Sequence, residues 1–234
     1  MSEESIQVNF GKPIALFPLN KAVLLPQQVL PLHIFEPRYR QMIARALDGS
    51  GQIAMAVFAG NRWRKEYHAR PPLRPAVCIG QIIEHERLPG GEFNILVQGV
   101  CRARIVEELP PSSERLFRAA RVEPVGIDSH AEAALEGVRE RLTEMLAEEP
   151  LSRLIRAEWV VKNIQNSAIP TEVILELVSF ALPTSSEGRY KLLAEGDAGQ
   201  RAGLVEHELR NLQRLIRTAA AQHPEAWPKG CSWN

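Results

Sequence analysis

The sequence predicts an α+β protein in which a strand-rich first half precedes a helical second half. Residues 1–127 contain short apolar runs, several alternating with a period of two, between proline- and glycine-containing turns. Residues 128–222 instead place apolar side chains three and four positions apart, behind helix-capping patterns. Short strands at this spacing indicate a barrel or a curled mixed sheet. Residues 223–234, with two prolines and two tryptophans, are predicted to form an irregular tail. We favour a tail that folds back with Trp227 on the bundle over one that serves as a docking peptide for a partner.

Composition limits the possible partners. The chain of 234 residues has 28 basic and 28 acidic side chains, so its formal net charge is zero. A neutral chain does not attract nucleic acid or an anionic membrane over long distances. The acidic first residues are not a secretory signal, and no early apolar run could cross a bilayer. Three widely spaced cysteines, without a CxxC pair, indicate free thiols in a reducing compartment, so we expect a cytoplasmic protein.

The first half is expected to hold one helix among its strands. Glu36-Pro37 opens this helix, since proline at the first helical position has the right φ and loses only an unbonded donor; the helix should end near Asp48-Gly49. Pro31 marks its strand as an edge or bulged strand. The strands are expected at Ile14–Phe17, Val29–Phe35, Ile53–Phe58, Val77–Leu88, Glu92–Val106 and Phe117–Val125.

The second half is expected to form five helices. Three begin with capping patterns, Ser129-x-x-Glu132, Thr184-x-x-Glu187 and Asp197-x-x-Gln200, and the other two are expected at Leu151–Asn166 and Thr171–Phe180. In the second helix the inner stripe is predicted to comprise Leu154, Ile155, Trp159, Val160 and Asn163. In the last, the core-facing residues are predicted to be Val205, Leu209, Leu212, Ile216 and Ala219.

Three segments together match the pattern of a known family: IALFPLNKAVLLPQQVLPLHIFEPRYRQMI, GQIIEHERLPGGEFNILVQGVCRARI and VSFALPTSSEGRYKLLAEGDAGQRAGLVEHEL. In this order they resemble the opening, the hairpin and the close of the amino-terminal domain of Lon proteases. The resemblance covers roughly residues 12–218 and implies a PUA-like mixed β-barrel followed by an α-helical bundle. It also implies binding of unfolded or tagged polypeptides, or of a protein partner; cereblon-type ubiquitin-ligase adaptors carry the same domain.

No enzymatic module of the Lon proteases is expected in this chain. A GxxxxGK[ST] phosphate-binding loop is missing, and the sequence ends before a serine–lysine protease module could begin. No GxSxG nucleophile pattern occurs either. We therefore expect a non-enzymatic binding module without cofactor or metal, and its oligomeric state is not predicted. A small-molecule enzyme using the cleft between the two halves is a third, less favoured hypothesis.

The candidate polypeptide-binding residues surround the start of the first helix: Leu32, Phe35, Glu36, Arg38 and Tyr39. An aromatic pair could hold apolar side chains there, and a charge pair could hold polypeptide ends. The alternative, which we favour, is architectural: Phe35 and Tyr39 pack together across the helix start, and Glu36 favours the helix amino terminus through the dipole.

A basic loop, residues 61–74, is the best nucleic-acid candidate. Its aromatic residues alternate with basic ones in Arg62, Trp63, Arg64, Lys65 and Tyr67, and bases could stack on such rings. Arg102 and Arg104 would extend this RNA-binding surface. The favoured alternative is a solvated insertion with one aromatic anchored to the barrel.

A metal site at Glu84-His85-Glu86 is not expected. In a strand the two glutamates share one face and the histidine points away, and no further ligand is suitably spaced. We interpret this run as a charged strand end.

Overall fold

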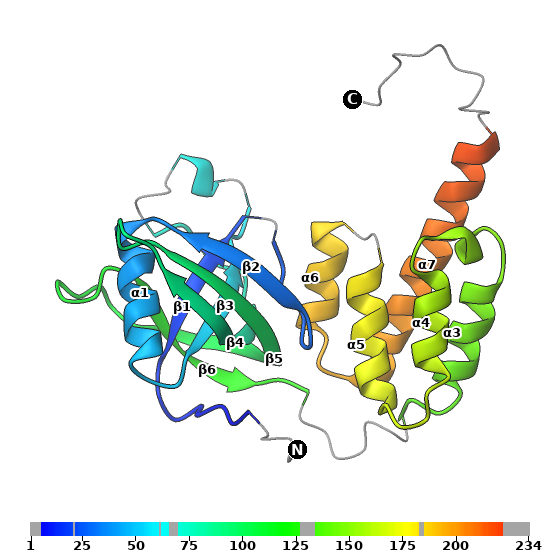
Figure 1. Cartoon of the computed structure of the whole chain (residues 1–234), viewed down its shortest axis with the longest axis horizontal. Coiled ribbons are helices and arrows are strands. Elements are labelled where there is room, and N and C mark those ends of the chain that lie inside the picture. The colour runs from blue at the N-terminus through cyan, green and yellow to red at the C-terminus, as the bar shows by residue number, and fades with distance from the viewer. Residues whose placement is uncertain are drawn as a thin grey trace, which may run out of the picture.

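The computed structural model describes residues 6–20, 22–60, 62–65, 70–126, 134–182 and 185–221. Figure 1 shows a twisted sheet on one side and a group of helices on the other. The predicted α+β class is therefore confirmed. The described strands end at Pro124 and the described helices of the bundle begin at Val138. The Ser129–Glu132 capping pattern, Tyr67 and the tail lie outside the described residues.

The sheet closes into a barrel because one strand is long enough to serve two partners. The strands are β1 (Ile14–Leu19), β2 (Val29–Ile34), β3 (Gln52–Val57), β4 (Ala76–Arg87), β5 (Phe93–Glu108) and β6 (Arg118–Pro124). Their order is β2-β5-β4-β3-β1-β6, and β6 also pairs with β5. The first part of β5 pairs with β2 and its last part with β6, so β1, β3, β4, β5 and β6 form a closed ring. Only β1 and β3 run parallel among these pairs.

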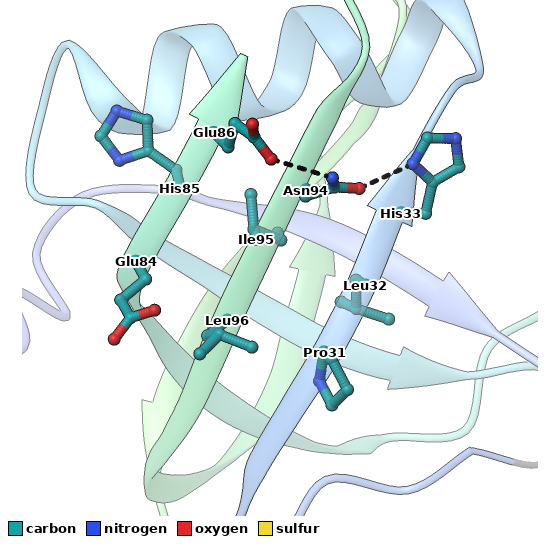
Figure 2. A pocket seen from close by; sticks show the side chains of 9 residues that line it. All are labelled: Pro31, Leu32, His33, Glu84, His85, Glu86, Asn94, Ile95 and Leu96. Atoms are coloured by element: carbon teal, nitrogen blue, oxygen red, sulfur yellow. Dashed lines mark hydrogen bonds between the residues drawn. The ribbon is translucent and has the colours of Figure 1, made fainter. Parts of the chain in front are cut away.

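Strand β2 lies outside the closed ring. It pairs with β5 from Val29↔Gln98 to Ile34↔Phe93, and among the described strands it has no second neighbour (Figure 2). The edge position predicted from Pro31 is therefore confirmed, because proline cannot donate to a second strand. The outer edge of β2 remains available for backbone hydrogen bonds.

Two apolar clusters fill the protein. Alanine and branched aliphatic side chains fill the barrel interior: Ile14, Leu16, Ala54, Ala56, Val77, Ile79, Ala103, Ala120 and Val122. The larger cluster joins the outside of the barrel to helix α1 (Pro37–Leu47) and to the bundle. Segment 23–25 is buried in that cluster and crosses Gly99, where a Cβ atom would lie 2.1 Å from the Leu25 carbonyl oxygen. Only glycine therefore fits at position 99.

The bundle contains five α-helices within the described residues. They are α3 (Val138–Ala147), α4 (Ala157–Ile164), α5 (Thr171–Ala181), α6 (Ser186–Ala194) and α7 (Ala198–Ala221). Asp197 caps α7 as predicted, accepting a hydrogen bond from the Gln200 amide at 2.7 Å. The cap of α6 is Ser185 rather than Thr184, since the Ser185 hydroxyl accepts from the Gly188 amide.

Two predicted helices are shorter than expected. Gly137 adopts a left-handed conformation (φ 68°), so α3 begins at Val138 and the described residues 134–147 do not form one continuous helix. Residues Leu151–Arg153 form a separate 3₁₀ turn, η2, and α4 begins only at Ala157.

The predicted inner stripe of the second helix is correct for Val160 and, in part, for Leu154, but wrong for Ile155 and Trp159. Its core residues are Ala157, Val160 and Ile164, whereas Ile155 is fully exposed and Trp159 about half exposed (103% and 49%). Extended backbone at Leu154 interrupts the helical repeat that the prediction assumed. In α7, Val205 and Leu209 are buried as predicted, Leu212 and Ile216 only partly, and Ala219 is exposed where the helix extends beyond its neighbours (Figure 1).

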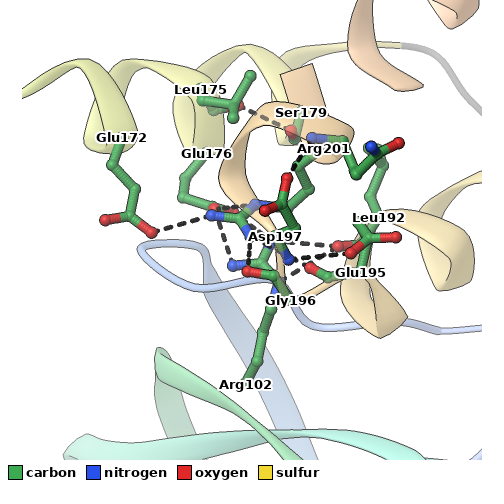
Figure 3. Close-up of polar contacts among 11 residues, drawn as sticks. Arg102, Glu172, Leu175, Glu176, Ser179, Leu192, Glu195, Gly196, Asp197 and Arg201 are labelled. Carbon is green, nitrogen blue, oxygen red and sulfur yellow. Dashed lines mark hydrogen bonds and ion pairs between the residues drawn. The ribbon is translucent and has the colours of Figure 1, made fainter. Parts of the chain in front are cut away.

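A buried ion cluster joins the barrel to the bundle (Figure 3). Arg102 of β5 donates two 2.8 Å hydrogen bonds to the Glu176 carboxylate of α5, and its guanidinium also reaches the Leu192 carbonyl of α6. Arg201 of α7 lies with its Nε atom 3.2 Å from Glu176 Oε1 and donates to Glu172. Burial lowers the pKa of Arg201, with a further contribution from the Arg102 charge, while Glu176 and Glu172 oppose the shift. Arg102 is thus a buried structural residue, so its predicted contact with RNA is wrong.

A second contact between the halves is more exposed. Arg74 forms two hydrogen bonds to Glu187 at the start of α6, at 2.6 and 3.0 Å, and its guanidinium lies 3.3 Å from the centroid of the Tyr190 ring. The Tyr190 hydroxyl accepts from the Ala76 amide at the start of β4. Helix α6 is therefore fixed to β4 independently of Arg102.

The cluster predicts that Glu176→Gln lowers the free energy of unfolding by about 3 kcal/mol or more, because two buried guanidinium groups lose the charge they share. Chemical denaturation measures this. Glu149→Gln removes an exposed pair with Arg153 and should cost less than about 1 kcal/mol. Equal costs for the two variants would contradict the assigned role of Glu176.

Candidate functional site

A groove of about 500 Å³ runs over β2, β5 and β4 (Figure 2). It is lined by Pro31, Leu32, His33, Glu84, His85, Glu86, Asn94, Ile95 and Leu96. The strand registers align these residues in rows, because His33 pairs with Asn94, and Asn94 in turn with Glu86. The groove thus combines an apolar floor with a polar row crossing three strands.

The polar row is connected by hydrogen bonds. The Asn94 amide donates to Glu86 at 3.2 Å, and its carbonyl oxygen lies 2.9 Å from His33 Nδ1 (Figure 2). His33 Nε2 is 3.1 Å from the Glu92 carboxylate. These contacts hold the His33 ring in place at the sheet edge. Glu84 pairs with Leu96, and Glu86 pairs with Asn94. The two glutamates therefore lie on the same face of β4, as the period of two predicted.

Exposed apolar side chains extend the groove along β2. Val29 is about half exposed and Phe35 is 59% exposed, although large apolar residues are usually buried. The Phe35 ring stacks on His33 with 6.1 Å between ring centroids. The open strand edge and these side chains therefore belong to one continuous surface.

The predicted Phe35–Tyr39 aromatic pair does not form. Tyr39 is buried (6% exposed) and packs edge-on against Phe17 with centroids 4.6 Å apart, whereas Phe35 faces solvent. Glu36 is the N-cap residue of α1 but makes no side-chain capping bond; it pairs with Arg38 at 2.9 Å. Of the five predicted residues, Leu32 lines the groove, Phe35 lies beside it, and Arg38 and Tyr39 line a different hollow.

That second hollow, the arginine pocket, encloses about 180 Å³. Its lining comprises Pro18, Arg38, Tyr39, Phe58, Arg70, Pro71, Pro111, Arg115, Leu116, Phe117 and Arg118. The Glu108 carboxylate accepts hydrogen bonds from two of these lining residues, Arg118 and Arg70. Burial alone would raise the pKa of Glu108, but these two guanidinium groups hold it below its ordinary value. Sequence reasoning did not single out Arg115, Arg118 or Glu108, because only strand pairing brings them near α1.

The basic loop is anchored to the barrel. Trp63, in the 3₁₀ turn η1 (Arg62–Arg64), stacks on Phe58 with 5.7 Å between centroids and 12° between planes. Arg64 lies over the outer ring of this pair. Lys65 is exposed. The aromatic anchor favoured from the sequence is therefore present, and Trp63 does not offer both of its faces to a base.

A match to a family model decides the classification. Residues 13–211 match the substrate-binding domain of the ATP-dependent protease La (Lon). The chain belongs to this Lon substrate-binding domain family. Lon protease of Trichlorobacter lovleyi is 27% identical over 95% of the chain, and that of Geobacter metallireducens 24% over 94%. The chain spans about a quarter (27%) of the length of either relative.

Solved structures show the same fold for this Lon-family chain. The amino-terminal domain of Mycobacterium avium complex Lon protease superposes with a TM-score of 0.61 at 19% identity, covering 85% of this chain and 98% of that one. A Lon amino-terminal domain protein from Xanthomonas campestris superposes with a TM-score of 0.56 at 18% identity, covering 88% of this chain and 98% of that one. The fold expected from the three sequence segments is confirmed.

The described ranges contain no candidate membrane span and no candidate metal site. No helix there has the length and apolar character needed to cross a bilayer. No group of three or more His, Cys, Asp or Glu side chains is arranged there to hold a metal ion.

The opposite environments of the two aromatic residues predict opposite mutational effects. Phe35→Ala should change the free energy of unfolding by less than about 0.5 kcal/mol, since its side chain already contacts water. Tyr39→Ala should cost about 3 kcal/mol or more, because it leaves a cavity beside Phe17. Urea denaturation of the two variants checks both values, and a large loss with Phe35→Ala would contradict the described exposure.

The lowered pKa of Glu108 predicts a pH-dependent contribution to stability. A carboxyl group whose pKa is depressed by folding stabilises the fold above its unfolded pKa, roughly 4.3, and loses this contribution as pH falls through the folded pKa. The difference in unfolding free energy between wild type and Glu108→Gln should therefore be largest near pH 7 and shrink below about pH 4. A difference in unfolding free energy that stays constant down to about pH 2.5 would contradict this prediction.

Proposed function

We propose that this chain is a non-enzymatic module that binds extended polypeptide segments in the groove over β2, β5 and β4. The observation that carries the proposal is the open edge of β2 beside exposed apolar side chains, Val29 and Phe35. An added strand could bond to the β2 backbone, while its side chains contact the apolar floor. Backbone bonding tolerates many sequences, which a module for varied clients needs.

Membership in the Lon substrate-binding domain family supports this proposal. In this role the chain would recruit clients, or an adaptor partner, for protein quality control, and a protease acting in trans would degrade what it holds. The relatives named Lon protease support the connection with proteolysis. No catalytic step is assigned to this chain.

The proposed compartment is the reducing cytoplasm. Cys78 and Cys101 are both free thiols, and burial raises the pKa of each above its ordinary value. Such protonated thiols react slowly and suit a compartment where disulfides are rare.

RNA binding by the basic loop gains no support from the described residues. Arg70 and Arg74 are paired with Glu108 and Glu187, Arg102 is buried, and Arg104 pairs with Glu123. It stays an alternative prediction, tested by salt-dependent binding of single-stranded RNA.

Substitution of the exposed apolar residues tests the proposal. The double variant Val29→Asp/Phe35→Asp should bind a fluorescently labelled, reduced and carboxymethylated polypeptide about tenfold or more weakly, because apolar contact is replaced by charge. Fluorescence anisotropy measures the affinity, and circular dichroism checks that the fold is kept.

The matched control is Ile155→Asp, which places the same charge on a fully exposed apolar position of the helical half. It should bind like wild type. Unchanged affinity of the double variant, or an equal loss in the control, would refute the groove as the binding site.

A further inference from the structure

We propose that the arginine pocket binds the free carboxylate at the carboxyl terminus of a polypeptide. This inference rests on the proposed function, because it names the part of a polypeptide that the module holds most specifically. It concerns a hollow that is separate from the groove over β2: the two sets of lining residues share no member.

The charge of the pocket selects an anion. Among its described lining residues are four guanidinium groups, from Arg38, Arg70, Arg115 and Arg118, and no carboxylate. Glu36 pairs with Arg38, and Glu108 is shared by Arg118 and Arg70. In the described part of the chain, the three guanidinium groups of Arg70, Arg115 and Arg118 thus have one carboxylate among them, that of Glu108, although the whole chain is neutral. An additional anion would relieve this local excess.

Arg115 is the residue best placed to hold that anion. It donates to the carbonyl oxygens of Pro110 and Phe117, at 2.6 and 3.3 Å, and pairs with no carboxylate in the described part of the chain. The two backbone bonds fix the guanidinium plane. A fixed guanidinium can bind a carboxylate without losing much conformational entropy.

The shape of the pocket fits one residue rather than a nucleotide. Its 180 Å³ is well below the roughly 300–1,000 Å³ of cofactor and drug sites. Prolines 18, 71 and 111 and the rings of Tyr39, Phe58 and Phe117 form apolar walls beside the guanidinium groups. A terminal carboxylate attached to an apolar side chain satisfies both parts of this lining.

Paired peptides test the inference on the full chain. A fluorescein-labelled decapeptide ending in leucine with a free carboxylate is compared, by anisotropy, with the same peptide ending in an amide. We expect the free acid to bind about tenfold more tightly or better, since a hydrogen bond to a charged group is lost in the amide.

Variants connect the preference to the pocket. Arg115→Gln should abolish the preference for the free acid, and Arg115→Lys should keep part of it, because the lysine retains the charge. Arg153→Gln, a matched change at an exposed position of the helical half, should keep the full preference.

The outcomes separate this inference from the proposed function. Equal binding of acid and amide by wild type would overturn the inference and leave the polypeptide groove standing. A preference that survives in Arg115→Gln, or is lost equally in Arg115→Lys, would also overturn it. Displacement of the acid peptide, but not of the amide peptide, by single-stranded RNA would reassign the pocket to phosphate. Binding of neither peptide would refute both proposals.

Discussion

The contact on which the architecture depends is the buried cluster of Arg102, Glu176 and Arg201. A barrel and a helical bundle could pack in several orientations through apolar contact alone, because such contact has no direction. Paired guanidinium and carboxylate groups do have direction, and removing one partner leaves an uncompensated buried charge. The cluster therefore fixes β5 against α5 and α7, and the Arg74–Tyr190 contact fixes β4 against α6.

Strand β5 transmits this constraint to the candidate site. The same strand that carries Arg102 pairs through its first part with β2, so the groove is built on a fixed strand. The closed ring leaves β2 as an open edge, and α1 begins directly after it. The first turn of α1 then contributes Arg38 and Tyr39 to the arginine pocket. The short connection from β2 to α1 thus links an element of the groove to an element of the arginine pocket.

Most strands and helices could be predicted from the sequence, because local residue patterns determine them. The period-two runs identified the strands, and Glu36-Pro37 identified the start of α1. The single helix predicted over residues 151–166 was wrong, because extended backbone at Leu154 interrupts the helical repeat; Val160 is buried as predicted, whereas Ile155 and Trp159 are exposed. The environment of Tyr39 was missed, because whether a helical aromatic faces solvent or Phe17 depends on β1. The arginine pocket could not be predicted, since its arginines come from α1, from the segment before β4 and from the start of β6, which only the complete fold brings together.

The central claim is that β2 pairs with an incoming polypeptide. Amide hydrogen exchange of residues 29–35, with and without a permanently unfolded polypeptide, tests it most directly. Exchange in this segment should slow on binding, while the exchange of α3 and α4 should be unchanged. Protection confined to the helical half, with no change in β2, would contradict it.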